Sequence, residues 1–211
     1  MNTLLNLNQA LRHSLLSAMC SGLMWASSSA AAAEGDYPTK PVSIIVAYAP
    51  GGQGDTFARL VSERLTAVYK QTVLVDNKPG VSGTVGTRLA VKARNDGYTL
   101  FLGQTGEIAV NRVLMKDLGY DPLKDFIPIT VTCQIPMVLV VNPDKIAARN
   151  LKDFVALAKA QPKFYAYASS GNGSTGHIAA ELFSSAAGVS YLHVPYKGNA
   201  QSMVDLLGGQ I

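Results

Sequence analysis

The sequence predicts an α/β protein with parallel sheets, and three observations support this prediction. Beyond Pro41, short apolar runs rich in β-branched residues alternate with stretches of helical periodicity. Glycine-rich loops follow several predicted strands at the point where a helix should begin. The composition, 48% hydrophobic and 15% charged, is that of a globular chain. Alternating strands and helices favour a parallel sheet covered by helices and joined by right-handed crossovers.

Composition and charge exclude several classes of protein. With 211 residues and only 2 cysteines, the chain is neither disordered nor disulfide-dense, and it can form one full domain or two small ones. The net charge of +4 comes from 18 basic and 14 acidic residues, and the basic residues are scattered. We therefore expect no nucleic-acid partner.

The N-terminal segment is predicted to lie outside the fold. Residues 2–33 contain no acidic residue, and Arg12 and His13 precede an apolar stretch, 15–26, that ends in small residues. This order is typical of a secretory signal peptide, and the stretch is too short for a membrane span. We expect residues 1–33 to be removed by cleavage after Ala33, which implies export.

The first predicted strand and helix surround a glycine-rich loop. Residues 42–47 are a nearly continuous apolar run between Pro41 and Pro50, as expected of a buried parallel strand. Asp55 is placed to cap the following helix. That helix has one apolar face with the spacing of an α-helix, formed by Phe57, Leu60, Val61, Leu65 and Val68.

The alternation continues and is interrupted once. Strands are predicted at 72–75 and 98–102 and helices at 82–93 and 105–115. Two strand-like runs, 127–133 and 137–141, then follow with no helix between them, which indicates a crossing into a second domain. Beyond it we predict helices at 151–160, capped by Asn150, at 174–187, stopped by Gly188, and at 199–207, with strands at 164–168 and 190–194. The predicted domains are a first lobe, 34–133, and a second lobe, 134–211.

Two strand-to-helix loops are candidates for anion binding. Glycines in loop 48–55 and loop 169–177 let a ligand approach the backbone, where free N–H groups and a helix N-terminus favour an anion. Loop 48–55 matches neither dinucleotide nor Walker patterns. Loop 169–177 contains Gly171, Gly173 and Gly176 in the spacing G-x-G-x-x-G, but no acidic residue ends the next strand, so we expect no nucleotide and no other cofactor.

Other candidates for chemistry are fewer. The polar turn 103–107 is consistent with a simple cap or with a ligand contact, and its Glu107 would repel an anion if it faced a binding cleft. The three histidines are His13, His177 and His193, with no carboxylate or cysteine cluster beside them, so no metal site is expected. His177 is expected to form hydrogen bonds rather than act as a general base.

Four motifs in this order resemble one family. They are Tyr48-x-Pro-Gly-Gly-x-x-Asp55, Asn77-Lys-Pro-Gly-x-x-Gly83, Ser170-Gly-Asn-Gly-Ser-Thr-Gly-His177, and Val194-Pro-Tyr-Lys-Gly198 followed by Asp205-Leu-Leu-Gly-Gly-Gln210. Together they are similar to the Bug receptors of the TctC family, the periplasmic substrate-binding proteins of tripartite tricarboxylate transporters. Members of that family run well beyond Ile211, so the chain resembles a C-terminally truncated member.

The resemblance implies a fold and a function. The fold would be a two-lobed periplasmic-binding-protein-like architecture of type II, with parallel sheets, flanking helices and an incomplete second lobe. The function would be capture of a small, carboxylated organic molecule in the periplasm, without catalytic residues, for a cognate inner-membrane permease. We expect a monomer. The ligand-binding residues implied by the resemblance come from loops of both lobes: Tyr48, Gly51, Gly52, Asp55, Gly83, Gln104, Thr105, Ser169, Ser170, Gly171, Asn172, Gly173, Ser174, Thr175, His177 and Tyr196.

Two alternatives remain at this point. A secreted α/β hydrolase-like enzyme could use the loop from Ser170 to His177, although Ser174 lacks the flanking Gly-x-Ser-x-Gly pattern of a nucleophile. A nonfunctional truncated remnant is the other, because exposed sheet edges would leave such a chain poorly folded or inactive.

Overall fold

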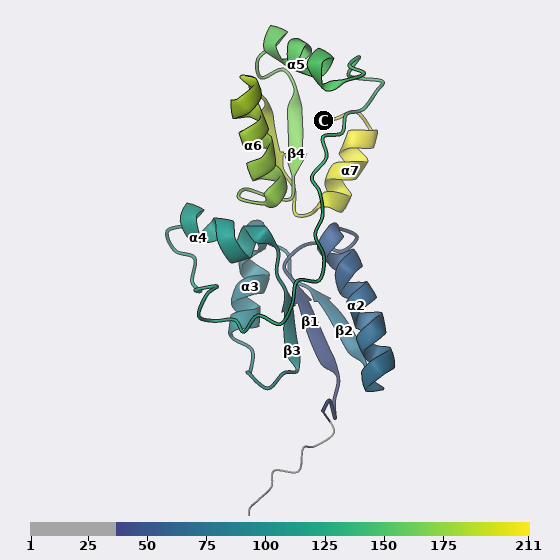
Figure 1. Cartoon of the computed structure of the whole chain (residues 1–211), viewed down its shortest axis with the longest axis vertical. Coiled ribbons are helices and arrows are strands. Elements are labelled where there is room, and N and C mark those ends of the chain that lie inside the picture. The colour runs from purple at the N-terminus through teal and green to yellow at the C-terminus, as the bar shows by residue number, and fades with distance from the viewer. Residues whose placement is uncertain (1–36) are drawn as a thin grey trace, which may run out of the picture. The chain divides into compact units, whose positions relative to one another are not determined.

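The first sheet is formed by three parallel strands. The computed structural model describes residues 37–211, and the predicted signal peptide lies outside these residues. Strands β1 (Val42–Val46), β2 (Val73–Asn77) and β3 (Thr99–Leu102) pair in the order β2-β1-β3, with Val42 opposite Val73 and Ser43 opposite Thr99 (Figure 1). All three lie where the sequence predicted strands, which confirms the α/β class with a parallel sheet.

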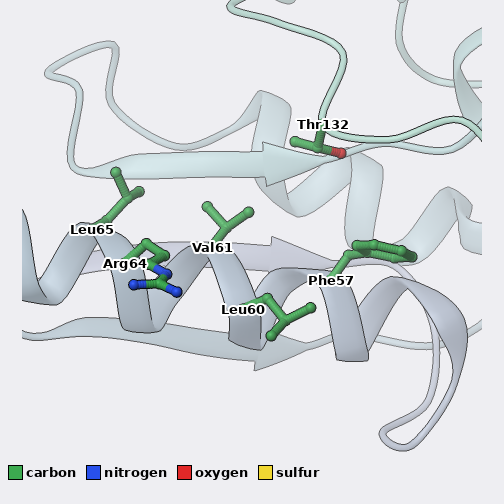
Figure 2. A pocket seen from close by; sticks show the side chains of 6 residues that line it. All are labelled: Phe57, Leu60, Val61, Arg64, Leu65 and Thr132. Carbon is green, nitrogen blue, oxygen red and sulfur yellow. The ribbon is translucent and has the colours of Figure 1, made fainter.

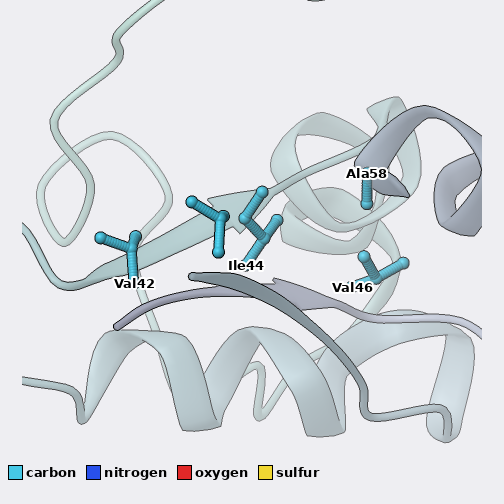
Figure 3. Packing of buried hydrophobic residues seen from close by; sticks show 5 residues of the cluster. Val42, Ile44, Val46 and Ala58 are labelled. Atoms are coloured by element: carbon cyan, nitrogen blue, oxygen red, sulfur yellow. The ribbon is translucent and has the colours of Figure 1, made fainter. Parts of the chain in front are cut away.

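The main hydrophobic core lies on the central strand of this sheet. The apolar run of β1 is buried because helices cover it on both faces, as expected for a parallel strand. Val42, Ile44 and Val46 are at most 2% exposed and pack with Val73 and with Ala58 of the following helix (Figure 3). This core fixes the end of β1, where the first glycine-rich loop begins.

Two of the helices in this region have a glycine as N-cap. Helix α2 (Gln53–Tyr69) has Gly52 as its N-cap, and Asp55 lies inside the first turn, so the predicted capping position of Asp55 is wrong. A 3-10 turn (Val81–Gly83) leads into α3 (Thr84–Val91), and a π-helical turn (Gly106–Val110) leads into α4 (Asn111–Leu114). A Cβ on Gly86 would lie 2.8 Å from Ala47 Cα, so glycine allows α3 to pack directly against the chain leaving β1.

The second sheet has two parallel strands, β4 (Ala166–Ser169) and β5 (Leu192–Pro195), with Ala166 opposite Leu192. Helices α5 (Leu151–Ala160), α6 (Thr175–Ala187) and α7 (Asn199–Leu207) were all predicted within one residue. The α5 cap is also confirmed, because Asn150 Oδ1 accepts a hydrogen bond from Asp153 N at 3.0 Å. Gly188 ends α6 in the left-handed conformation, as predicted. Within residues 37–211, no helix is long and apolar enough to cross a bilayer.

The two strands predicted at 127–133 and 137–141 are absent. This stretch forms no strand, and many of its apolar side chains are exposed: Ile127, Ile129, Val131, Met137, Val138, Leu139 and Val140. A β-strand needs a hydrogen-bonded neighbour, and none of the strands described in residues 37–211 pairs with this stretch. The prediction of these two strands is therefore wrong for the part of the chain that the structure describes.

Candidate ligand-binding site

The candidate residues lie at the carboxyl ends of parallel strands, in five loops. Residues 48–55 follow β1, Gly83 lies in the segment after β2, 103–107 follow β3, 169–177 begin at the end of β4, and Tyr196 directly follows β5. Because parallel strands end at the same edge of a sheet, the loops of each sheet share one edge. Within residues 38–211, which form one compact unit, several of these loops are in direct contact.

Asp55 closes the first loop onto helix α2. Its Oδ2 atom accepts hydrogen bonds from Gly51 N at 2.9 Å and from Arg59 Nε at 3.0 Å. Burial alone would raise the pKa of Asp55, but the hydrogen bonds from Arg59 and Gly51 outweigh it and lower the pKa below its usual value. Asp55 therefore carries a full negative charge whose role is to hold the loop.

Glu107 and Tyr48 form a buried pair that joins two loops. The Tyr48 hydroxyl donates to Glu107 Oε2 at 2.8 Å, and Gln104 N donates to Glu107 Oε1 at 2.9 Å. Glu107 is 0% exposed and Tyr48 is 5% exposed. Burial raises the pKa of Glu107 to about 7, and burial together with the neighbouring Glu107 raises the pKa of Tyr48. The direction of Glu107, which the sequence left open, is inward.

Two glycines lie against the Tyr48 hydroxyl. A Cβ on Gly83 would lie 3.3 Å from this oxygen, and a Cβ on Gly106 would lie 3.2 Å from it. Gly83 also has a φ of +85°, in the left-handed region that favours glycine. Any side chain at these positions would press on the Tyr48 and Glu107 pair.

Ser169 and His193 shape the start of the second loop. Ser169 Oγ lies 2.7 Å from His193 Nε2 and also bonds to the N–H and carbonyl of Gly171, both at 3.1 Å. Burial and the neighbouring His177 lower the pKa of His193, which favours its neutral form. The sequence predicted a site role for Ser169 but not for His193, because the contact joins neighbouring strands and has no local spacing signal.

His177 and Ser174 hold the rest of this loop. Gly173 N donates to His177 Nδ1 at 3.1 Å, and the rings of His177 and His193 stack with centroids 4.3 Å apart. Ser174 is the N-cap of α6, and its Oγ accepts a hydrogen bond from His177 N at 3.4 Å. Ser174 therefore acts as a helix cap, and none of the described hydrogen bonds gives it a catalytic base.

Loops from the two sheets meet through glycines. A Cβ on Gly106 would lie 3.3 Å from Gly173 O, and one on Gly171 would lie 3.0 Å from Ser82 Oγ. A Cβ on Gly173 would lie only 2.7 Å from Asn111 Oδ1. This Asn111 oxygen is buried and has no hydrogen-bond donor among residues 37–211. Because these glycines have no side chain, the loops of the first sheet and loop 169–177 of the second sheet can approach closely.

The remaining candidates are placed less centrally. Asn172 and Thr105 are exposed, and Ser170 and Thr175 are partly exposed. The Tyr196 hydroxyl donates to Asp205, while Tyr196 N donates to Ser169 O at 2.9 Å, so Tyr196 supports the loop through its backbone.

Both long loops leave backbone donors available at a helix start. In α6, His177 N is capped by Ser174 and Ile178 N bonds to Ser174 O, whereas no described acceptor takes the N–H groups of Thr175 and Gly176. Gly52 gives α2 no side-chain cap, so the first turn of α2 is also uncapped. Such N–H groups, together with the helix dipole, can bind a carboxylate.

A separate apolar pocket lies along α2. It is lined by Phe57, Leu60, Val61, Arg64 and Leu65 of the helix and by Thr132 (Figure 2). Arg64 is its single charged residue, and the pocket contains none of the candidate residues. Within residues 37–211, no three His, Cys, Asp or Glu side chains cluster in a way that could hold a metal ion.

The sequence and the fold are similar to known periplasmic receptors. Protein BugT of Bordetella pertussis is 38% identical over 176 residues, which are 83% of this chain and 54% of BugT. The solved structure of R. palustris Rpa4515 with adipate has a TM-score of 0.81 at 36% identity, and that of MatC from Rhodopseudomonas palustris with bound malate has 0.77 at 27%. These alignments cover 83% of this chain and 58% and 59% of the two structures.

The family model named "Tripartite tricarboxylate transporter family receptor", TctC, matches residues 57–211. The chain spans about half the length of the curated relatives it matches. This is a family of solute-binding receptors and not of enzymes. The chain belongs to the TctC family of tripartite tricarboxylate transporter receptors.

Proposed function

We propose that this chain captures a small, carboxylated organic molecule in the periplasm and presents it to the permease of a tripartite tricarboxylate transporter. Two family members of similar structure are described with adipate and with malate, which supports a carboxylate ligand. Membership of a transporter receptor family supports the permease as partner. The proposed lobes are 34–133 and 134–211, each containing one of the two sheets.

The main support for this proposal is that the loop after β3 lies against loop 169–177 at the start of α6. Gly106 of the first lobe lies against Gly173 and Ser174 of the second. A ligand carboxylate held there would accept hydrogen bonds from the N–H groups of Thr175 and Gly176, while the first turn of α2 offers further donors. Partial charges at helix starts are sufficient to bind a carboxylate without an arginine.

Thermal melting with a ligand panel tests the proposal. A ligand that binds only the folded chain must raise the melting midpoint, by about 2.7 kcal/mol of stability at a ligand concentration 100 times Kd. We expect adipate, malate or a related carboxylate to raise it, and 1,6-hexanediol, which has the length of adipate but no charge, to leave it unchanged. A cooperative melt that no carboxylate shifts would contradict the proposal.

A pair of glycine variants tests the location of the site. Gly106→Val places a side chain against the Tyr48 hydroxyl and Gly173 O, so it should abolish the shift. Gly188→Asn, at the far end of α6, keeps a residue that tolerates the left-handed conformation and should retain the shift. Equal shifts in both variants would place the ligand elsewhere.

A further inference from the structure

The buried carboxyl of Glu107 has no role in the binding scheme described so far. Its two oxygens accept hydrogen bonds from Gln104 N and from the Tyr48 hydroxyl, and none of the ion pairs formed by residues 37–211 includes it. Because burying an ionised carboxylate without a cation costs free energy, the protonated form of Glu107 is favoured. The pKa of Glu107, raised by burial to about 7, is consistent with this.

The protonation state of Glu107 decides what the Tyr48 hydroxyl can offer. When Glu107 is ionised, the Tyr48 proton is engaged in the 2.8 Å bond to Oε2, and the tyrosine oxygen can only accept further hydrogen bonds. When Oε2 carries a proton, Glu107 can donate to the tyrosine oxygen, and the Tyr48 proton is released to another acceptor. A ligand carboxylate is an acceptor only, so it requires the second state.

The surroundings leave Glu107 as the group that titrates at this point. Tyr48 contacts it from the loop after β1, and the Tyr120 hydroxyl donates to its backbone carbonyl at 2.8 Å. The pKa of both tyrosines is raised by burial, so both are neutral at physiological pH. Arg88 faces Tyr120 and donates to the carbonyls of Asp117 and Leu118.

We propose that Glu107 couples ligand capture to proton uptake: one proton from solvent binds to Glu107 Oε2 when a carboxylate ligand accepts a hydrogen bond from Tyr48. No covalent bond of the ligand changes, and the proton comes from water or buffer acid. The site therefore gains the ligand and one proton together. Because the proton neutralises Glu107, the Tyr48 oxygen never lies between two ionised carboxylates. This inference rests on the proposed function, and it makes Glu107 a positioning residue for Tyr48.

Calorimetric titration of the whole chain with adipate tests the coupling. The titration is made at pH 8 in phosphate and in Tris, two buffers that differ in ionisation enthalpy. The difference between the two binding heats gives the number of protons taken up. We expect close to one proton per adipate at pH 8 and close to none at pH 6, where Glu107 is mostly protonated and adipate is still mostly the dianion. Affinity should fall about tenfold for each pH unit above pH 7. Proton uptake near zero at pH 8 would overturn the inference, and this measurement requires no variant.

Two glutamate variants provide the matched comparison. Glu107→Gln is permanently neutral, and its amide can donate to the Tyr48 oxygen while its carbonyl accepts from Gln104 N, so it should bind adipate with no proton uptake and no fall in affinity to pH 8.5. Glu181→Gln removes the other tyrosine-bonded glutamate, an exposed residue whose Oε1 accepts from Tyr167 at 2.7 Å. It should behave like the unmodified chain.

The outcomes separate this inference from the proposed function. Proton uptake that persists in Glu107→Gln would come from another group, such as a histidine of loop 169–177, and would overturn the coupling at Glu107. Binding without any pH dependence would overturn the inference and leave the proposed function standing. If no carboxylate of the panel binds at pH 6 or pH 8, the proposed function fails and the inference fails with it.

Discussion

The two sheets differ in how completely their surroundings bury them. In the first, β1 is central, its core residues are at most 2% exposed, and it is flanked by strands on both edges. In the second, the two strands pair only with each other among the strands of residues 37–211, and α6 and α7 contain no buried residue. Because apolar burial is the main stabilising contribution, at about 25 cal/mol per Å², the first sheet should supply most of the stability of the chain.

The largest expected effect is therefore on β1. Ile44→Ala removes a side chain that is 2% exposed and should lower the free energy of unfolding by about 2–5 kcal/mol. Leu192→Ala in β5, where the side chain is 59% exposed, should cost less than about 1 kcal/mol. Urea unfolding of both variants measures the difference, and equal losses would show that the second sheet is as tightly packed as the first.

Glu107, in the loop after β3 of the first sheet, should make the free energy of unfolding depend on pH. Its pKa is about 7 in the folded chain and near the usual 4.5 when unfolded, so the folded state holds more protons between these values. The free energy of unfolding should therefore decrease as the pH rises from about 4.5 to about 7, by roughly 3 kcal/mol at most. Denaturant melts across this range should show the slope, and Glu107→Gln should remove it. An unchanged slope in that variant would assign it to other groups.

Glycine-to-alanine variants compare the packing of one helix beside each sheet, and their expected effects on stability are smaller. Gly86→Ala in α3 would place a Cβ 2.8 Å from Ala47 Cα and from Lys78 O, so it should destabilise by about 1–3 kcal/mol. Gly176→Ala in α6 meets nothing closer than 3.8 Å, and the better helix propensity of alanine should stabilise by up to about 1 kcal/mol. Thermal melts compare the two, and a loss in Gly176→Ala would indicate packing that the structure lacks.

The smallest expected effect concerns helix caps. In the first region α2 and α3 start at Gly52 and Gly83 without a side-chain cap, whereas α5 is capped by Asn150. Asn150→Ala should cost about 1 kcal/mol, within the range of 0.5–2 for such caps. Asn150→Asp keeps the acceptor and should stay within about 0.5 kcal/mol in the same chemical unfolding assay. An Asn150→Ala variant with an unchanged free energy of unfolding would show that packing, and not the cap, stabilises α5.

Local patterns predicted most of the helices and strands because each depends on nearby residues. Helical periodicity, the Asn150 cap and the Gly188 stop all act within one or two turns, and these predictions were confirmed. The strands predicted at 127–133 and 137–141 failed because pairing depends on a partner elsewhere. For the candidate site, the sequence predicted which loops connect a strand to a helix, and their role in ligand binding stays a prediction. The inward direction of Glu107 and the contact between Ser169 and His193 arise only when separate strands are brought together.

Loops 48–55 and 169–177 are proposed to form one ligand site. Amide hydrogen exchange of the chain with and without a carboxylate that shifts its melting midpoint tests this claim directly. We expect slower exchange in both loops together, at the first turns of α2 and α6, with no change along the apolar pocket at Leu60 and Thr132. Protection in only one loop, or protection confined to that pocket, would contradict the account.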